Sequence, residues 1–379
     1  MAITVRPISG KKEMKQFVKF RIDLYKESPY AIPPLYIDEL MTLDSKKNPA
    51  FDFSEAQCFM AFDGEKPVGR ICAIINHRAN EVWKTKNARF GFIDFIDDIA
   101  VSSALLQAAQ DWAKSKDMTH IQGPLGFTDL DQEGMLVEGY DQMSTMATIY
   151  NYPYYPKHIE QLGFVKDAEW VEHRIYSKGT TDIPEKHRRI SEIAMKKYNL
   201  RILKLKSARK TVKDGYAHKL FDLLNDSYSH LYGFTPLTPK QIDYYIKLYL
   251  TMVKMEYVSF IIDENDEMIG MGIAVPSLSS ALRKAQGKLL PFGFFHILKA
   301  MFMKNPVVDL LLIAVRKDYQ NKGVNALLFY DLIPIFLKAG ITYAECHPEL
   351  VENTKVQSQW DYFENEIHKR RRAYIKELN

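Results

Sequence analysis

The chain has 379 residues, of which 46% are hydrophobic and 26% charged, and its formal net charge is +4 at pH 7. This length predicts two or three domains, and the composition is typical of a soluble globular protein. The net charge is too small to indicate nucleic-acid binding. The three cysteines, Cys58, Cys72 and Cys346, are too scattered for a disulfide scaffold or a metal site.

The first residues lack the apolar run of a signal peptide, and no run of about 18 apolar residues indicates a transmembrane helix. Together with the few cysteines, this predicts a cytoplasmic protein.

The first half of the chain alternates between strand and helix patterns. In chain order it predicts a strand over 2–8, a helix over 11–26, two strands around an Asp-Gly turn within 56–77, a strand over 90–96, a helix over 104–117 and a strand over 119–127. Ser102 or Ser103 is the expected N-cap of the helix over 104–117.

The second half repeats this order. The predicted elements are a strand over 200–205, a helix over 214–233, a helix that begins at Thr238 with Gln241 three residues later, a hairpin over 256–277, a strand over 307–315, a helix that Gly340 ends, and a strand over 341–348. The hairpin sequences FMAFDGEKPVGR (59–70) and FIIDENDEMIGM (260–271) also match. We therefore expect an internal duplication.

One loop, within VRKDYQNKGVNALL, has more hydrogen-bond donors than a turn between a strand and a helix requires. The first turn of a helix has free amide N–H groups and the positive end of the helix dipole, and a glycine there lets an anion approach the main chain. Arg316, Lys317 and Lys322 add positive charge. The loop is therefore a candidate phosphate site; an ordinary turn with surface lysines is the alternative.

This order of elements, with this loop after the fourth strand, resembles the GNAT (Gcn5-related N-acetyltransferase) superfamily. Gln320, Asn321, Lys322, Gly323 and Val324 match the family's Q/R-x-x-G-x-G/A pattern, and Asn325 stands where the family has Gly or Ala. The resemblance implies an α/β (α+β) fold of two tandem GNAT-like acyl-CoA N-acyltransferase units. Each unit would have a mixed, mostly antiparallel sheet flanked by helices.

The resemblance implies an N-terminal unit over 1–176, a linker and connecting helix over 177–198, and a C-terminal unit over 199–379. The first unit has no Q-x-x-G pattern, so only the second is expected to bind the cofactor. That cofactor would be acetyl-CoA or a longer acyl-CoA, with an acyl-carrier thioester as an alternative. The implied binding residues are Val315, Arg316, Gln320, Asn321, Lys322, Gly323, Val324, Asn325 and Ala326.

Acyl transfer from a thioester to an amine needs a base for the amine and a proton for the leaving thiolate. Glu345 and His347 leave the fifth strand two residues apart, which places them on one face, and are the candidate bases. A structural carboxylate and a solvent-side histidine are the alternatives. Trp360 stands where the family has a tyrosine, so Tyr362 is the candidate acid.

The polar segment 123–164 is too long for a plain connection and is interpreted as a substrate wall. Asp129, Asp131 and Glu133 would hold a cationic amine, and Tyr154 and Tyr155 would pack against the substrate. An ordered surface loop without a ligand is the alternative.

The insertion 277–305 is basic and rich in aromatic residues and methionine. It would cap a long acyl chain, lie on a membrane surface, or pack on its own domain. The expected function is transfer of an acyl group from CoA to a small-molecule or lipid amine held between the units. The alternatives are a non-catalytic acyl-CoA sensor and a membrane-peripheral lipid N-acyltransferase. The sequence does not indicate an oligomeric state.

Overall fold

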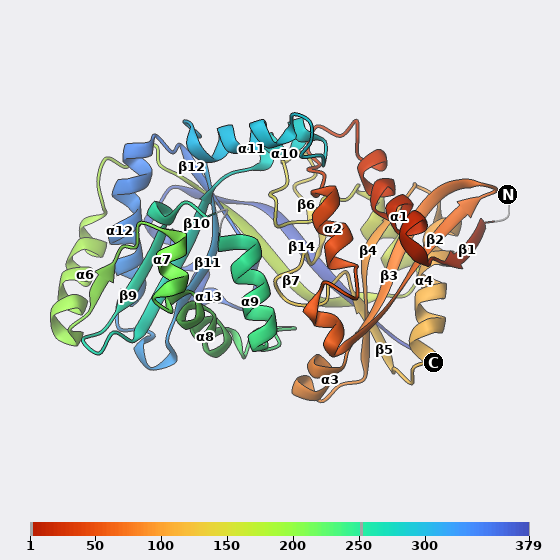
Figure 1. Cartoon of the computed structure of the whole chain (residues 1–379), viewed down its shortest axis with the longest axis horizontal. Coiled ribbons are helices and arrows are strands. Elements are labelled where there is room, and N and C mark those ends of the chain that lie inside the picture. The colour runs from red at the N-terminus through yellow and green to blue at the C-terminus, as the bar shows by residue number, and fades with distance from the viewer. Residues whose placement is uncertain (1–2, 251–252, 379) are drawn as a thin grey trace.

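The computed structural model of the chain describes residues 3–250 and 253–378, and both halves of the chain contribute strands to its sheet (Figure 1). The first half contributes β1 (Ile3–Pro7), β2 (Ser54–Asp63), β3 (Lys66–Asn76), β4 (Asn87–Phe95), β5 (His120–Gly123), β6 (Met135–Glu138) and β7 (Val165–Tyr176). The second half contributes β8 (Arg201–Leu203), β9 (Val258–Ile262), β10 (Met268–Pro276), β11 (Val307–Val315), β12 (Tyr343–Cys346), β13 (Glu349–Leu350) and β14 (Asn365–Glu377).

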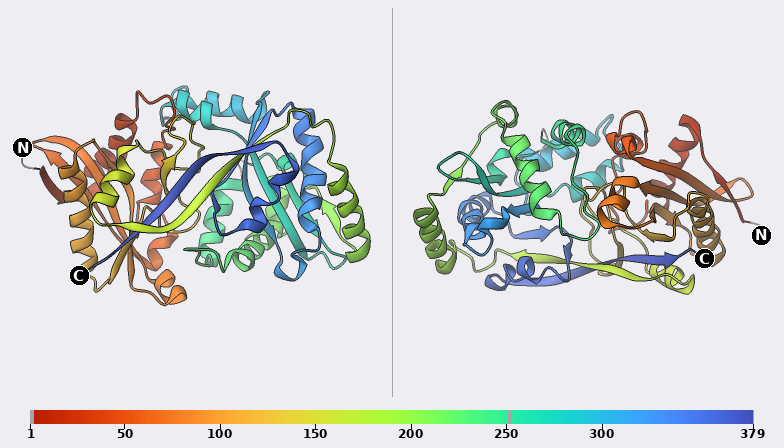
Figure 2. Two further views of the ribbon diagram at one scale, coloured as in Figure 1. Left: turned by 180° about the vertical axis from the view of Figure 1, so that it is seen from behind. Right: turned by 90° about the horizontal axis from the view of Figure 1, so that it is seen from below.

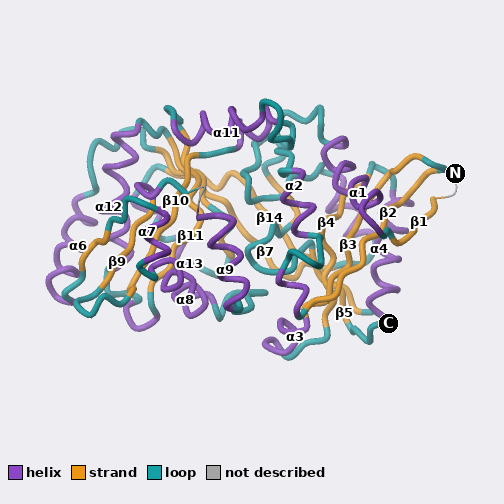
Figure 3. The backbone as a smooth tube through the Cα atoms, viewed as in Figure 1, coloured by secondary structure: helices purple, strands orange, loops and turns teal. Residues whose placement is uncertain are grey.

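Helices surround the sheet in both halves (Figure 3). Those of the first half are α1 (Gly10–Leu24), α2 (Tyr36–Thr42), α3 (His77–Trp83), α4 (Ile99–Lys114) and α5 (Tyr154–Gln161). Those of the second half are α6 (Glu185–Tyr198), α7 (Ala208–Lys213), α8 (Tyr216–Tyr228), α9 (Pro239–Tyr249), α10 (Ser279–Ala285), α11 (Gly293–Phe302), α12 (Val324–Ala339) and α13 (Thr354–Gln357). None of the described helices is long and apolar enough to cross a membrane.

All strands of the described residues belong to one sheet, with the order β1-β2-β3-β4-β5-β14-β7-β12-β11-β10-β9-β8; β6 pairs with β14, and β13 pairs with β7. Most neighbours are antiparallel, but β4 and β5 pair in parallel, as do β11 and β12. This mixed sheet with flanking helices, repeated in the two halves, confirms the expected fold class.

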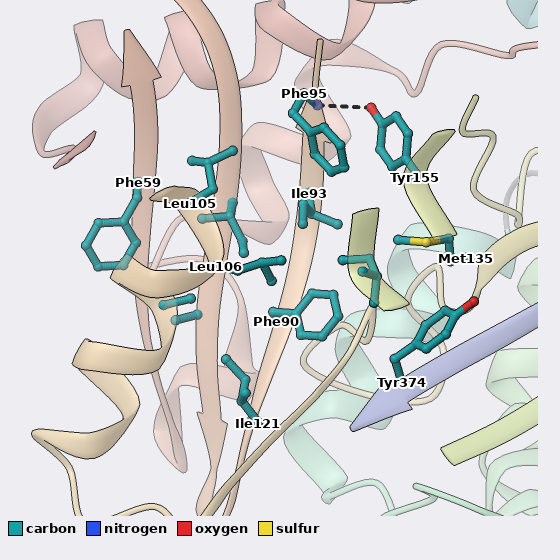
Figure 4. Close-up of a cluster of buried hydrophobic side chains, with 14 of the residues drawn as sticks. Phe59, Phe90, Ile93, Phe95, Leu105, Leu106, Ile121, Met135, Tyr155 and Tyr374 are labelled. Atoms are coloured by element: carbon teal, nitrogen blue, oxygen red, sulfur yellow. Dashed lines mark hydrogen bonds between the residues drawn. The ribbon is translucent and has the colours of Figure 1, made fainter. Parts of the chain in front are cut away.

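Each half buries apolar side chains on both faces of its part of the sheet. In the first half, α1 packs on one face through Phe17, while α4 and α5 pack on the other through Leu105 and Ile159 (Figure 4). In the second half, α8 and α9 cover one face, and α6 and α12 cover the other. The duplicated pattern therefore produces two similar three-layer cores.

The matching hairpins have a packing reason for their shared glycine. A Cβ on Gly69 would come within 2.6 Å of Leu105 on α4, and a Cβ on Gly270 within 2.9 Å of Val324 on α12. Because real Cβ atoms do not approach other atoms so closely, any larger residue at either position would displace a helix side chain, so glycine lets the helix pack close to the strand.

The two halves exchange their last strands. β14, from the end of the chain, pairs with β5 of the first half, whereas β7, from the first half, pairs with β12 of the second. β7 and β14 also pair with each other in antiparallel orientation, and Figure 2 shows this two-stranded ribbon crossing between the halves. The ribbon therefore makes the two halves one hydrogen-bonded body.

Buried ion pairs hold the ribbon together. Glu172 on β7 accepts a hydrogen bond of 2.8 Å from Lys369 Nζ on β14, and Arg371 Nε donates to its other oxygen. All three side chains are fully buried. Burial alone would raise the pKa of Glu172, but Arg371 and Lys369 lower it to about 2. Glu172 is therefore a carboxylate throughout the neutral range.

The sequence predicted the caps of α9 and α12 correctly and the N-cap of α4 incorrectly. The expected capping box of Thr238 and Gln241 begins α9, and Gly340, with φ +74°, ends α12. The expected N-cap at Ser102 or Ser103 is wrong, because α4 begins earlier, with Asp98 as its N-cap. Ser102 lies inside the helix, where its hydroxyl is 3.0 Å from His158 Nδ1.

We predict that Glu172→Gln destabilises the protein by about 3–5 kcal/mol, because a buried cation pair then faces a neutral amide. Denaturant unfolding followed by circular dichroism measures this loss. The control is Glu138→Gln, which removes an exposed carboxylate that pairs with Arg370 of the same β14 at 3.2 Å. A change above about 1 kcal/mol in the control, or below it in Glu172→Gln, would contradict the role of the buried pair.

Candidate active site

A cleft of about 530 Å³ lies between the two halves. Residues of α1, α2 and the loop after β5 line it from the first half; residues of α8, α9, β11 and α12 line it from the second. Most of the lining is apolar, including Ile32, Leu35, Leu250, Leu282, Ile297 and Met301. The cleft can therefore take a long aliphatic ligand.

One wall of the cleft carries three carboxyl groups, on Asp129, Asp131 and Glu133. Burial raises the pKa of Asp129 to about 7, although the neighbouring Arg89 opposes the shift, and burial also raises the pKa of Glu133. The structure thus brings together the three acids that the sequence predicted. At neutral pH such a cluster holds part of its negative charge and can accept a proton from a cation.

Tyrosines of α8 and α9 close the cleft beside the acids. Tyr245 Oη lies 2.9 Å from Thr128 Oγ1, and Tyr228 Oη donates to the carbonyl oxygen of Ile313 at 2.9 Å. Burial raises the pKa of both phenols. Both phenols are therefore neutral: Tyr245 joins the loop after β5 to the second half, and Tyr228 joins α8 to β11.

β11 and β12 separate at the cleft. Their parallel pairing covers Val307–Leu310 against Tyr343–Cys346, and the N–H of His347 still donates to the carbonyl of Leu310 at 3.0 Å. Beyond this point β11 continues to Val315, and Leu311 and Ile313 line the cleft. The main chain of β11 therefore has an edge that faces the opening instead of a strand.

The residues from Val315 to Ala326 form the turn between β11 and α12. Gly323 is the N-cap of α12, with φ +81°, and no side chain caps the free amides of the first turn. A Cβ at Gly323 would lie 2.5 Å from Ile190 of α6, so glycine is required both by the backbone and by the neighbouring helix. Ile313 and Leu328, on the flanking strand and helix, line the cleft.

The positive charges of this turn differ in how they are compensated. Arg316 pairs with Asp318 at 2.7 Å, and Lys317 lies 3.4 Å from Asp226. Lys322 lies over the rings of Tyr198 and Tyr319 and has no carboxylate within 4.0 Å among the described residues. An uncapped helix N-terminus beside this lysine fits the pyrophosphate of a coenzyme A thioester.

The corresponding place in the first half is filled by its own side chains (Figure 4). Tyr155 Oη accepts from the N–H of Phe95 at 3.0 Å, Tyr154 Oη donates to the carbonyl of Phe95 at 2.6 Å, and Asp98 caps α4. Tyr155 also reaches the cleft, whereas Tyr154 is not among the cleft residues. In the second half the matching helix, α13, is a single turn, and it is α8 that bonds β11 beyond Leu310, through Tyr228 to the carbonyl of Ile313 and Ser227 to the carbonyl of Val315.

The three expected catalytic residues lie in different places. His347 lines the cleft, and burial lowers its pKa to about 4. Glu345 faces away from the cleft, where Arg174 donates to it at 2.8 and 2.9 Å. Burial raises its pKa, but His368, Lys369 and Arg174 more than offset this and keep the pKa low. Tyr362 is 46% exposed on the surface and accepts from Lys186.

Sequence reasoning missed a second polar group in the cleft. Glu349 accepts from Trp360 Nε1 at 2.9 Å and lies 3.2 Å from His173 Nδ1. Glu349 and Trp360 line the cleft, and His173 is buried behind them. Glu349 follows His347 by two residues, so the run ECHPE carried the signal, but the partner His173 is distant in sequence.

Sequence comparison finds two similar curated proteins, and no protein-family model matches the chain. The bacterial ceramide synthase of Caulobacter vibrioides is 29% identical over 321 residues, which cover 84% of this chain and 82% of that protein. Protein YghO of Escherichia coli is 29% identical over 387 residues, which cover 99% of this chain and 95% of that protein.

Structure comparison gives matches along the whole chain. A tandem GNAT protein from the clavulanic acid biosynthesis pathway superposes with a TM-score of 0.58 at 12% identity, covering 100% of this chain and 99% of that one. The chain has the tandem GNAT fold. A GCN5-related glucosamine N-acetyltransferase region of a fungal enzyme also superposes, with a TM-score of 0.54 at 12% identity, covering 99% of this chain and 38% of that one.

We predict that His347 makes the tandem GNAT fold less stable in mild acid. Its pKa is about 4 in the folded protein and about 6.5 when unfolded, so the unfolded chain binds more protons below pH 6.5. This one group should lower the free energy of unfolding by roughly 2 kcal/mol between pH 7 and pH 5.

Denaturant unfolding of wild type and His347→Gln at these two pH values measures the effect. Between pH 7 and pH 5 the free energy of unfolding should fall by roughly 2 kcal/mol less in the variant than in wild type. His230→Gln, which removes an exposed histidine, is the control and should behave as wild type. Equal pH dependence in all three proteins would show that His347 is not held neutral.

Proposed function

We propose that the protein is an acyl-CoA-dependent N-acyltransferase that acylates a lipid amine. The observation that carries this proposal is the cleft between the halves, which joins an apolar lining, a half-buried acidic wall and the opening between β11 and β12. The units proposed from the sequence, 1–176 and 199–379 with 177–198 between them, would each supply one side of this site in a cytoplasmic enzyme.

The similar curated proteins support a lipid acceptor. One of them is called a ceramide synthase, and a ceramide is the amide of a fatty acid and a long-chain amino alcohol. The apolar lining suits two aliphatic chains, and the carboxyl groups suit the ammonium group of such an amine.

The second unit would hold the acyl donor. The first turn of α12 with Gly323 and Lys322 fits its pyrophosphate. The edge of β11 that no strand pairs with beyond Leu310, where Tyr228 and Ser227 bond two of the carbonyls, would accommodate its pantetheine arm. Bound there, a thioester supplies the acyl carbon and a thiol leaving group. Either acetyl-CoA or a longer acyl-CoA fits the turn, and the apolar cleft favours the longer chain.

The acceptor must arrive as an ammonium ion and react as a neutral amine. The carboxylate of Asp129 would bind the ion and, with a pKa near 7, accept its proton, beside the carboxyl group of Glu133, whose pKa burial also raises. His347, neutral in the same cleft, is the other candidate base. Glu345 is a poor base because its ion pairs favour the charged form.

A non-catalytic acyl-CoA sensor is the second candidate function. Tyr362, the residue expected to protonate the thiolate, lies on the surface, and Trp360 occupies the cleft instead. Such a sensor would bind acyl-CoA but release no thiol with any amine.

We predict that Lys322→Glu lowers the affinity for acetyl-CoA and palmitoyl-CoA about tenfold or more, because it replaces a phosphate partner by a repelling charge. The new glutamate also lies near the N-terminus of α12, where a negative charge favours the helix. Calorimetric titration measures the affinity, and Lys26→Glu, an exposed site in the first half, is the control. Failure of the wild-type protein to bind either thioester would refute the cofactor assignment.

We predict that Asp129→Asn lowers kcat/KM for a long-chain amine about 100-fold while acyl-CoA affinity stays unchanged, because the variant removes both a charge and a proton acceptor. A thiol-release assay measures the rate, and its rise between pH 6 and pH 8 should follow a group with a pKa of about 7 in wild type only. Asp141→Asn, on the exposed part of the same segment, is the control. Wild-type kinetics in Asp129→Asn would remove this residue from the reaction.

A further inference from the structure

The helical hairpin of α10 and α11 lies along one edge of the molecule, beside the junction of the two halves (Figure 1). It belongs to the segment 277–305, which carries five Lys and Arg side chains and no Asp or Glu. The segment connects β10 to β11 and so stands next to the cleft.

α11 has a broad apolar face, of which one part is buried and the adjoining part is exposed. Ile297 and Met301 face inward: they are buried against α10 and line the cleft. Phe295, Leu298 and Phe302 recur at helical spacing on the adjoining part of this face and are 56%, 45% and 71% exposed. An apolar face this wide belongs in a protein core or in a lipid environment, and here the protein core covers only one part of it.

The exposed apolar surface continues into the ends of the hairpin. Leu290 and Phe292, before α11, are 75% and 69% exposed, and Met303, after it, is 62% exposed. Large apolar side chains gathered on one surface in this way indicate an interaction site.

Positive charge surrounds this apolar surface without local compensation. Lys284, Lys288, Lys299 and Lys304 are exposed, and none of them has a carboxylate within 4.0 Å among residues 3–250 and 253–378. Arg283 donates to the main-chain carbonyl of Pro29. Aromatic and aliphatic side chains rimmed by lysines match an anionic bilayer, in which acyl chains lie beneath negative headgroups.

We propose that the α10–α11 hairpin docks on an anionic lipid bilayer, with Phe292, Phe295 and Phe302 below the headgroups and the lysines among the phosphates. Because Ile297 and Met301 of the same helix line the cleft, docking would bring the cleft wall against the membrane. A lipid amine would then reach the acidic wall without crossing water. This last step rests on the proposed function, whereas the docking itself does not.

Co-sedimentation of the whole chain with phosphatidylcholine vesicles, with and without phosphatidylglycerol, tests the proposal. Wild type should bind the anionic vesicles, and Phe295→Ser/Phe302→Ser should lose about tenfold or more of its partition. Lys299→Glu/Lys304→Glu should lose the preference for phosphatidylglycerol. The matched control is Val165→Ser/Ile193→Ser, which removes two exposed apolar side chains elsewhere and should bind as wild type.

Equal binding of wild type and the Phe295→Ser/Phe302→Ser variant, with both folded by circular dichroism, would overturn the proposal, as would absence of wild-type binding. If the hairpin instead binds another protein, wild type should not bind the vesicles. The outcome is independent of catalysis. Vesicle binding without thiol release would contradict the proposed function but support the docking. Acyl transfer to a dissolved amine without vesicle binding would support the proposed function but contradict the docking.

Discussion

The exchange of β7 and β14 is the constraint on which the rest of this structure depends. Each half of the sheet is completed by a strand that the other half supplies, and Glu172, Lys369 and Arg371 are buried where those strands meet. Buried ions specify an arrangement because any other register leaves a charge without its partner. The ribbon therefore sets how the halves face each other, and with it the shape of the cleft between them.

The duplicated halves differ in structure at the end of β4 and at the corresponding part of β11. Tyr154 and Tyr155 satisfy the main chain of β4 at Phe95, so this edge needs no ligand. In the second half, β11 leaves β12 after Leu310, and the adjoining helix is short. The first half then contributes to the site differently, through the acidic loop after β5.

Features that depend on local sequence were predictable. The paired hairpins, the capping box of α9 and the Gly323 turn each follow from residues a few positions apart. The exchange of strands was not predictable, because the partners of β14 are set by contacts with residues more than 180 positions away. The same limit applied to Glu345: its position suggested a base, but Arg174 and His368, which make it a structural carboxylate, come from β7 and β14.

The position of β14 also affects how the protein is made. Synthesis runs from the N-terminus, and domains generally fold as they emerge from the ribosome. Here the strand that pairs with β5 is Asn365–Glu377, which follows the whole second half of the sheet in sequence. The first half can collapse early, but one edge of its sheet stays open until residues 365–377 have been synthesised. Its completion is therefore a late event, and chaperones have reason to protect that edge while the second half is being translated.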